Sequence, residues 1–225
     1  MYEISFRAIS SYFAPLPQAL LMTLWLSLLT ILFSTLVGLA GALCRTSGVR
    51  GLRVLGAAYV EVLRNIPLLV VIYLVFFGLA QVGLLVDGFD SALIALTLNA
   101  GAYMTEIFRG GLVAIPRGQY EAARSQGMTG VQLYRYVVFP QVFRIIYAPL
   151  GNLFIGVIIG SSLASVIGVE EVSTWMHMVG DQSFRYIETF LVSALVYLVL
   201  AQAVNVGRIS AGRLLLRSAP ESAHR

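Results

Sequence analysis

Lysine is absent from this 225-residue sequence, and charged residues of all kinds make up only 12% of it. A soluble domain of ordinary composition carries about 25% charged residues. This shortage of charge, together with 58% hydrophobic residues and apolar runs as long as a bilayer is thick, indicates a chain whose solvent is lipid. The length suits one membrane domain and leaves no room for a separate soluble catalytic domain.

Cysteine and histidine are scarce as well. The single Cys44 cannot form a disulfide within the chain, and its place at the end of an apolar run predicts packing rather than chemistry. His177 has no second histidine, cysteine or cluster of carboxylates beside it, so the sequence predicts no metal site. No catalytic triad pattern is present, and without lysine the phosphate loop Gly-x-x-x-x-Gly-Lys-Ser/Thr cannot exist. We therefore expect a chain that is not an enzyme and does not itself hydrolyse a nucleotide.

Five apolar runs approach or exceed the length of about 20 residues that a helix needs to cross a bilayer. They cover residues 19–43, 66–86, 91–108, 142–163 and 187–206. The first eighteen residues contain Glu3, Arg7 and two prolines, which is unlike a signal peptide. We expect an all-α integral membrane protein with five transmembrane helices. Residues 1–18 form an extracytoplasmic segment, residues 19–208 the membrane domain and residues 209–225 a cytoplasmic tail.

The arginines predict the orientation, because short cytoplasmic loops carry an excess of Lys and Arg. Arginines gather between the first and second runs, between the third and fourth, and after the fifth. The other two loops are mainly acidic and contain Arg185 alone. This alternation places the N-terminus outside and the C-terminus in the cytoplasm. It also assigns the net charge of +4 to contact with anionic lipids rather than with nucleic acid.

The predicted cytoplasmic loop at residues 110–140 is far longer than the usual connection of about 4–6 residues. Pro116 suits the first turn of a helix, and the run after it consists mostly of fair to good helix formers. Gly127 supplies the left-handed residue at which a helix can stop. We expect a second short helix from about Gly130 to Tyr136, which would end before the proline at position 140.

Together these two helices predict an elbow that projects into the cytoplasm. Ala122 and Ala123 would give its first helix a small-residue face that a partner could approach closely. Glu121 lies near the first turn, where the helix dipole favours an acid. The alternative interpretation is a pair of interfacial helices that lie on the lipid headgroups.

The spacing of this loop resembles the EAA loop of bacterial ABC-importer permeases. That pattern is Glu-Ala-Ala, three residues, Gly, nine residues and Ile-any-Leu-Pro, and residues 121–140 match the spacing throughout, with Val137 and Phe139 as conservative changes. The resemblance implies a coupling helix that docks into a groove of a separate ATPase subunit. The residues that it assigns to this docking are Gln119, Glu121, Ala122, Ala123, Gly127 and Pro140.

Other segments are similar to the polar amino-acid branch of that family, which includes histidine, glutamine and arginine permeases. They are residues 23–27, 59–69, 99–111 and 116–119, together with Pro149 and Asn152. One departure concerns the fourth run, where the branch has Lys-Asp-Thr-Ser-Leu and this chain has Ile159-Gly160-Ser161-Ser162-Leu163. The loss of both charges fits one half of an unequal pair, or a less charged substrate.

The resemblance also implies the partners. An ATPase chain would bind ATP and magnesium, and an extracytoplasmic solute-binding protein would deliver the solute, docking near Trp175. Five spans are too few to enclose a pathway, so we expect a second permease subunit, identical or not, in the bacterial inner membrane. Two alternatives stay open: an importer permease for another small solute, such as an opine or an amino-acid derivative, and a non-ABC channel or scaffold protein.

Polar side chains at membrane depth are costly and are by default a functional hypothesis. The candidate pathway residues are Asn99, Tyr103, Glu106, Asn152, Ser161 and Ser162. The first three are spaced i, i+4 and i+7 and so share one helical face. The alternatives are an ion pair of Glu106 with Arg109, and hydrogen bonds of Asn99 or Asn152 to neighbouring helices. After Gly160 the helix is expected to break and to let backbone groups face a cavity.

Overall fold

The computed structural model describes residues 3–215, and every regular element within that range is helical. The elements are η1 (Phe6–Tyr12), α1 (Leu16–Thr46), α2 (Arg50–Asn65), α3 (Leu68–Gln81), α4 (Gly88–Val113), α5 (Arg117–Ser125), α6 (Gly130–Leu133), η2 (Tyr134–Val138), α7 (Phe139–Gly160), η3 (Ser161–Ile167), α8 (Val172–Ser183) and α9 (Tyr186–Leu215). The predicted all-α fold class is therefore confirmed.

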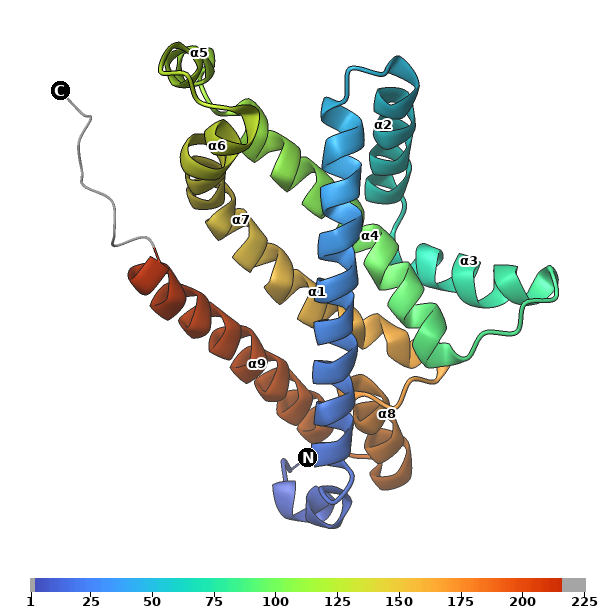
Figure 1. The fold of residues 1–225 in the computed structure, drawn as a ribbon. Helices are drawn as coiled ribbons and strands as arrows, with labels where there is room; N and C mark the ends of the chain where they lie inside the picture. The colour runs from blue at the N-terminus through green and yellow to red at the C-terminus, as the bar shows by residue number, and fades with distance from the viewer. Residues whose placement is uncertain (1–2, 216–225) are drawn as a thin grey trace.

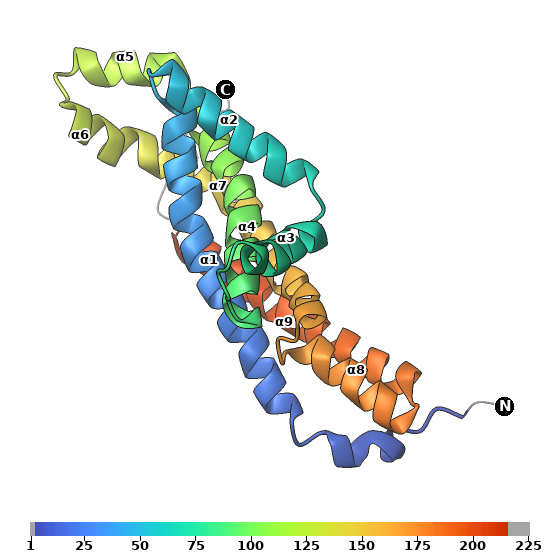
Figure 2. The ribbon, with the colours of Figure 1, turned by 90° about the vertical axis from the view of Figure 1, so that its right-hand side faces the viewer.

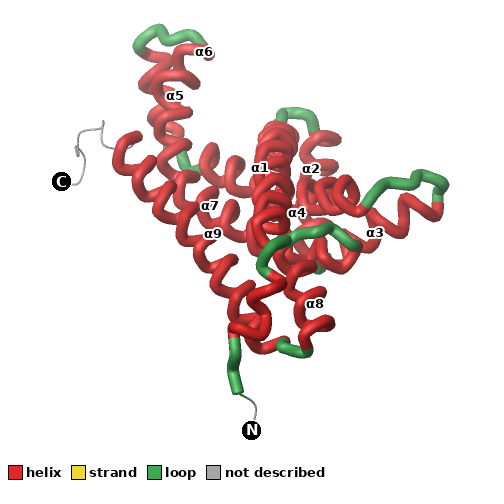
Figure 3. Tube along the Cα trace, turned by 90° about the horizontal axis from the view of Figure 1, so that it is seen from below, coloured by secondary structure: helices red, strands yellow, loops and turns green. Residues whose placement is uncertain are grey.

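Helix α4 lies at the centre of the bundle, with α1, α2, α3 and α7 packed against it (Figure 1). The α5–α6 segment lies at one end of the bundle, and α8 lies with η1 at the other (Figure 2). Seen along the bundle, α3 and the α5–α6 segment project to different sides (Figure 3). We call the end that carries α5 and α6 the elbow end and the end that carries α8 the opposite end.

Within the described range, three helical stretches are long and apolar enough to cross a bilayer: Leu16–Thr46, Gly130–Ile167 and Tyr186–Arg213. Helices α2 and α3 qualify as a fourth only when they are taken together, and the two are bent by 106°. Helix α3 has 14 residues, which is too short to span alone. The prediction that residues 66–86 form one spanning helix is therefore wrong. Pro67 disfavours helical backbone at Ile66, which is extended, so that the chain turns between α2 and α3.

Helix α4 contains the third predicted span, yet it is not among these three stretches. Other helices surround α4, and alanine, glycine, serine and threonine make up much of its buried surface. A helix surrounded by other helices does not need a surface as apolar as one that faces lipid. The count of five spans stays a prediction.

Glycines let the backbones of α1 and α4 come into direct contact. A Cβ atom on Gly38 would overlap the side chain of Met104, and one on Gly41 would overlap the Thr105 hydroxyl. From the other helix, a Cβ on Gly101 of α4 would lie 2.8 Å from the Val37 side chain of α1. Small residues at these positions are therefore required for the α1–α4 packing, as in other close helix pairs.

At the opposite end, the carboxylate of Glu171 joins α1, α8 and α9. This side chain is completely buried and caps α8, accepting hydrogen bonds from the backbone N–H groups of Ser173 at 2.7 Å and Thr174 at 3.2 Å. It also accepts one from the Thr23 hydroxyl of α1 at 3.3 Å and one from the Tyr197 hydroxyl of α9. In the sequence, Glu171 is one of several acidic residues between the fourth and fifth predicted spans, and nothing there sets it apart from its neighbour Glu170.

Burial raises the pKa of Glu171 above its ordinary value of 4.5, and the hydrogen bonds oppose this shift only in part. The folded state therefore binds the proton more tightly than the unfolded state. The resulting stabilisation is complete below pH 4.5 and is lost as the pH rises through the raised pKa.

We expect Glu171→Gln to remove this pH dependence. Thermal melts of the purified protein should show the wild type losing stability relative to the variant as the pH rises from 4.5 to 8. Glu171→Ala should lower the melting temperature by about 1–8 °C, because losing an N-cap costs about 0.5–2 kcal/mol and each kcal/mol shifts a chain of this size by about 2–4 °C. The exposed neighbour Glu170 is the control. Equal effects of Glu170→Ala and Glu171→Ala would contradict the capping role.

Candidate functional site: the elbow and the central cavities

Helix α5 begins and ends close to where the sequence predicts. Pro116 is its N-cap rather than a residue of its first turn. Gly127 has the left-handed φ of 75°, and its N–H donates to the Arg124 carbonyl at 2.9 Å. The N–H of Met128 reaches back to the Ala123 carbonyl at 3.2 Å. This pair of bonds is a Schellman motif, which fixes the direction in which the chain leaves the helix.

The second helix of the elbow starts where predicted but does not end there. Thr129 and Gln132 form a capping box at the start of α6. The helix then widens into the π-helical turn η2, and α7 follows without a break. Pro140 lies in the first turn of α7, so the prediction that it ends a short helix is wrong. Proline lacks an N–H and crowds the carbonyl four residues earlier, and the wider π turn gives that carbonyl room.

The elbow is attached to the membrane helices by its own apolar face. Ala123 is only 5% exposed and belongs to a buried cluster with Leu133, Val138 and residues of α4 and α7. The prediction that Ala122 and Ala123 together face a partner is therefore corrected: Ala123 packs inward, whereas Ala122, Glu121 and Gln119 are exposed. Adjacent positions on a helix point about 100° apart, so two successive alanines cannot serve the same surface equally.

Asn99 and Tyr103 line a cavity of about 220 Å³ between α3, α4 and α7. The Asn99 amide donates to the Leu63 carbonyl at the end of α2, at 2.9 Å, which is the alternative that the sequence left open. The guanidinium of Arg64 lies over the Tyr103 ring, 5.0 Å from its centroid. This cation–π contact places a positive charge beside the cavity. Arg64 is not among the predicted pathway residues, although it lies in the segment 59–69 that resembles the polar amino-acid branch.

Glu106 is held by two arginines. Its carboxylate pairs with Arg109 one turn later on α4 at 2.7 Å and with Arg45 of α1 at 3.2 Å. The ion-pair interpretation is therefore confirmed, and the contact with α1 is an addition. Glu106 also lines a second cavity of about 330 Å³, together with Tyr103, Arg64 and Pro149. Its place in a pathway stays a prediction.

The remaining candidates lie on α7 and η3. Asn152 is exposed on α7. The hydroxyls of Ser161 and Ser162 donate to carbonyls one turn back in the helix, Ile158 at 2.8 Å and Ile159 at 2.6 Å. The α-helix does give way after Gly160 to the 3-10 helix η3. Ser161 is buried, so the structure does not bring it onto the cavity that Asn99 and Tyr103 share.

Arg208 lies within α9 and packs against α7, two residues beyond the end of the fifth predicted span. A Cβ atom on Gly151 would overlap its side chain, and the Tyr147 hydroxyl donates to its carbonyl at 2.6 Å. The glycine in α7 is the signal that could have identified this contact, because it leaves room for one large side chain.

Comparison with known proteins agrees with this architecture. Residues 34–207 match the family model described as binding-protein-dependent transport system inner membrane component. The chain is 35% identical over 185 residues to a probable glutamine ABC transporter permease protein of Bacillus subtilis (strain 168), covering 82% of this chain and 86% of the relative. It is also 35% identical over 191 residues to the L-cystine transport system permease protein of the same organism, covering 84% and 82%.

Among solved structures, the crystal structure of an amino acid ABC transporter with histidines superimposes with a TM-score of 0.87 at 33% identity, covering 94% of this chain and 99% of that one. The chain belongs to the family of binding-protein-dependent transport system inner membrane components. The resemblance to ABC-importer permeases, which rested on residues 121–140, is thereby confirmed.

Proposed function

We propose that this permease translocates a polar amino acid, delivered by an extracytoplasmic binding protein, and that a separate ATPase drives it by gripping α5. The observation that carries this proposal is the division of α5 into two faces. Ala123 anchors the inner face in the membrane bundle, while Glu121 and Ala122 stay exposed on the outer face. A helix held in this way transmits a push from a docked partner to the spans instead of swinging freely.

The proposed orientation follows from the arginines. The elbow end carries exposed arginines, among them Arg50, Arg53, Arg117 and Arg124, and it would face the cytoplasm. The N-terminus and α8 would face outside, where the binding protein docks. ATP and magnesium would be bound by the ATPase, and a second permease would complete the pathway.

The substrate class rests on the relatives and on the central cavities. The most similar relatives described above are named for glutamine and cystine, and the solved neighbour for amino acids. The cavities beside Asn99 and Tyr103 are small, and Arg64 supplies a positive charge that suits a carboxylate. The fourth span has no charged residue at Ile159 or Gly160. A charge on the side chain of the solute would therefore have to be paired by a residue of the second permease.

We expect the permease to co-purify with the ATPase when their genes are expressed together, and amino acids to raise ATP hydrolysis in proteoliposomes that contain the binding protein. Glutamine, arginine and cystine are the first solutes to test. At least one should stimulate hydrolysis severalfold, since substrate loading favours the conformation in which the ATPases close. Hydrolysis unaffected by any amino acid, but raised by another solute class, would overturn the substrate assignment. A permease that never associates with an ATPase would overturn the whole proposal.

A further inference from the structure

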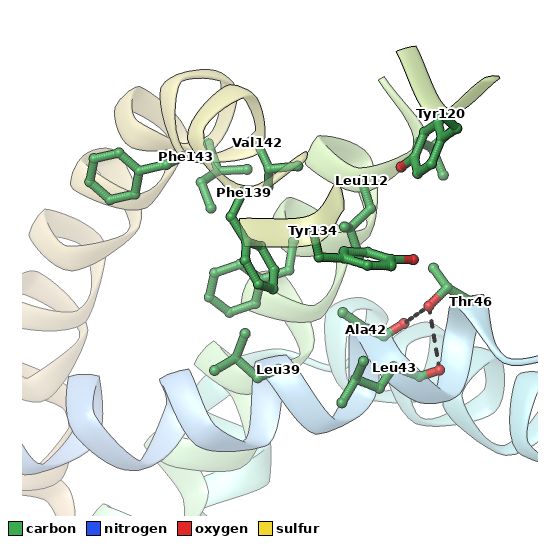
Figure 4. Close-up of a pocket in the computed structure, with 13 residues that line it drawn as sticks. Leu39, Ala42, Leu43, Thr46, Leu112, Tyr120, Tyr134, Phe139, Val142 and Phe143 are labelled. Carbon is green, nitrogen blue, oxygen red and sulfur yellow. Dashed lines mark hydrogen bonds between the residues drawn. The ribbon is translucent and has the colours of Figure 1, made fainter. Parts of the chain in front are cut away.

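A large cavity lies at the elbow end, and of its lining residues only Ile146 also lines one of the two smaller cavities beside Tyr103. Its volume is about 940 Å³, near the upper end of the range of about 300–1,000 Å³ typical of ligand pockets. Side chains from α1, α4, α5, η2 and α7 surround it (Figure 4). The lining is apolar except for three hydroxyls, and its residues include Leu39, Leu43, Leu112, Phe139 and Phe143.

The cavity adjoins an exposed apolar stripe of α1. Leu32, Leu36, Leu39 and Leu43 recur at helical spacing and are 54%, 58%, 46% and 68% exposed, so they form one apolar stripe along this membrane-crossing helix. The last two members of the stripe line the cavity. On the other side of its mouth, Phe139 of α7 is 59% exposed. A hydrocarbon chain that follows the stripe would therefore enter the cavity without crossing water.

Polar groups at the cavity point to an amphiphile rather than to a pure hydrocarbon. The hydroxyl groups of Tyr120 and Tyr134 lie at the cavity on the side of Thr46, and neither makes a hydrogen bond to the part of the chain that the structure describes (Figure 4). A tyrosine hydroxyl is a hydrogen-bond donor at neutral pH even without a shift of its pKa, and burial, with Tyr134 nearby as the second cause, raises the pKa of Tyr120 further. Phosphate and ester oxygens accept from such donors.

The helix that carries Tyr120 also carries positive charge. Arg117 and Arg124 flank Tyr120 at positions i−3 and i+4 on α5, which places all three on neighbouring sides of the helix. Both are exposed, and neither takes part in any of the ion pairs formed within residues 3–215. Positive charge at the end of an apolar cavity complements an anionic headgroup.

The cavity uses a different face of α4 from the candidate pathway residues. It uses Phe108 and Leu112 of α4, whereas Asn99, Tyr103 and Glu106 line the smaller cavities. Phe108 is two residues after Glu106 and therefore points about 200° away around the helix. A solute that passes along the face of Asn99 would not compete for the large cavity.

We propose that this cavity binds an acyl chain of an anionic phospholipid, with the headgroup at Tyr120, Arg117 and Arg124. The chain of the lipid would fill the space between α1 and α7, and the headgroup would rest against the elbow. The site belongs to the permease chain alone and does not depend on which solute is transported.

The test is native mass spectrometry of the permease complex, purified with its ATPase from nanodiscs of equal phosphatidylcholine and phosphatidylglycerol. We expect phosphatidylglycerol to be retained about fivefold or more over phosphatidylcholine, because one arginine near the membrane surface favours an anionic lipid by about that factor. Leu39→Trp places a large side chain at the mouth of the cavity, where it would exclude the acyl chain. This variant should reduce the retained phosphatidylglycerol at least fivefold, which corresponds to about 1 kcal/mol.

Leu32→Trp is the matched control, because Leu32 lies on the same stripe two turns away and is similarly exposed. It should retain the lipid as the wild type does, and equal melting temperatures of the two variants would exclude misfolding as the cause. The double variant Arg117→Gln, Arg124→Gln should keep the bound lipid but lose the preference for phosphatidylglycerol. Retention unchanged by Leu39→Trp, or a preference unchanged by the double variant, would overturn the proposal, whatever the ATPase activity of the complex.

Discussion

Replacement of Ala122 with tryptophan is expected to reduce ATP-driven uptake by about fivefold to a hundredfold while the permease still folds and inserts. Ala122 is exposed on the outer face of α5, where the proposed ATPase groove would close around it. An oversized side chain in a packed contact costs about 1–3 kcal/mol, which is about five- to more than a hundredfold in association. Uptake in proteoliposomes, with the ATPase and ATP inside and the binding protein outside, and the affinity of the ATPase for the permease are the two measurements.

Val49→Trp supplies the control for this prediction, since Val49 is 59% exposed and lies at the same end of the bundle, between α1 and α2. It adds the same bulk outside the elbow and should leave uptake unchanged. Wild-type uptake and ATPase affinity in the Ala122 variant would show that the outer face of α5 is not the docking surface. A fall in uptake with unchanged affinity would place the defect elsewhere in the transport cycle and would also contradict the prediction.

Gly41→Val is expected to lower the melting temperature of the permease by about 2–12 °C. Its side chain would overlap Thr105 in the contact between α1 and α4, the most extensive pair of helices in the bundle. Overpacking by a few carbons costs about 1–3 kcal/mol, occasionally more, and each kcal/mol lowers the melting temperature of a chain of this size by about 2–4 °C. The helix offers no compensation, because valine is only slightly better than glycine there. Melting temperature and yield after membrane extraction are the measurements.

Two further variants isolate the cause. Gly51 is also a helical glycine, in α2, and a Cβ atom there would meet nothing within 4 Å. Gly51→Val should therefore be nearly neutral. The double variant Gly41→Ala, Thr105→Ala should be more stable than Gly41→Ala alone, because the hydroxyl and methyl groups nearest to the new Cβ are removed. If Thr105→Ala fails to relieve the defect, steric overlap with α4 is not its origin.

The parts of the fold that the sequence predicts well are those encoded locally. Gly127 ends α5 because a left-handed residue is needed there, and the structure gives it a φ of 75°. The shared face of Asn99 and Tyr103 follows from helical periodicity alone. The spaced pattern at residues 121–140 was sufficient for the family, since several residues at fixed separations rarely coincide by chance.

The errors come from contacts between elements distant in the sequence. Ala123 could not be separated from Ala122 without knowing which side of α5 rests on α4 and α7. Pro140 suggested a helix end, because a π-helical turn leaves no clear signal in a single sequence. Glu171 looked like one of several loop acids, although a carboxylate directly before a helix is the expected N-cap. Its burial depends on Thr23 and Tyr197, which are 148 and 26 residues away.

The glycine contacts between α1 and α4 limit how this bundle can move. Side chains of one helix occupy notches in the other at Gly38, Gly41 and Gly101, so sliding would force atoms through one another. The two helices must therefore travel as a single rigid body. Any rearrangement has to take place at helix contacts without such interlocking side chains. The sharp turn between α2 and α3 is the place where the chain can act as a hinge.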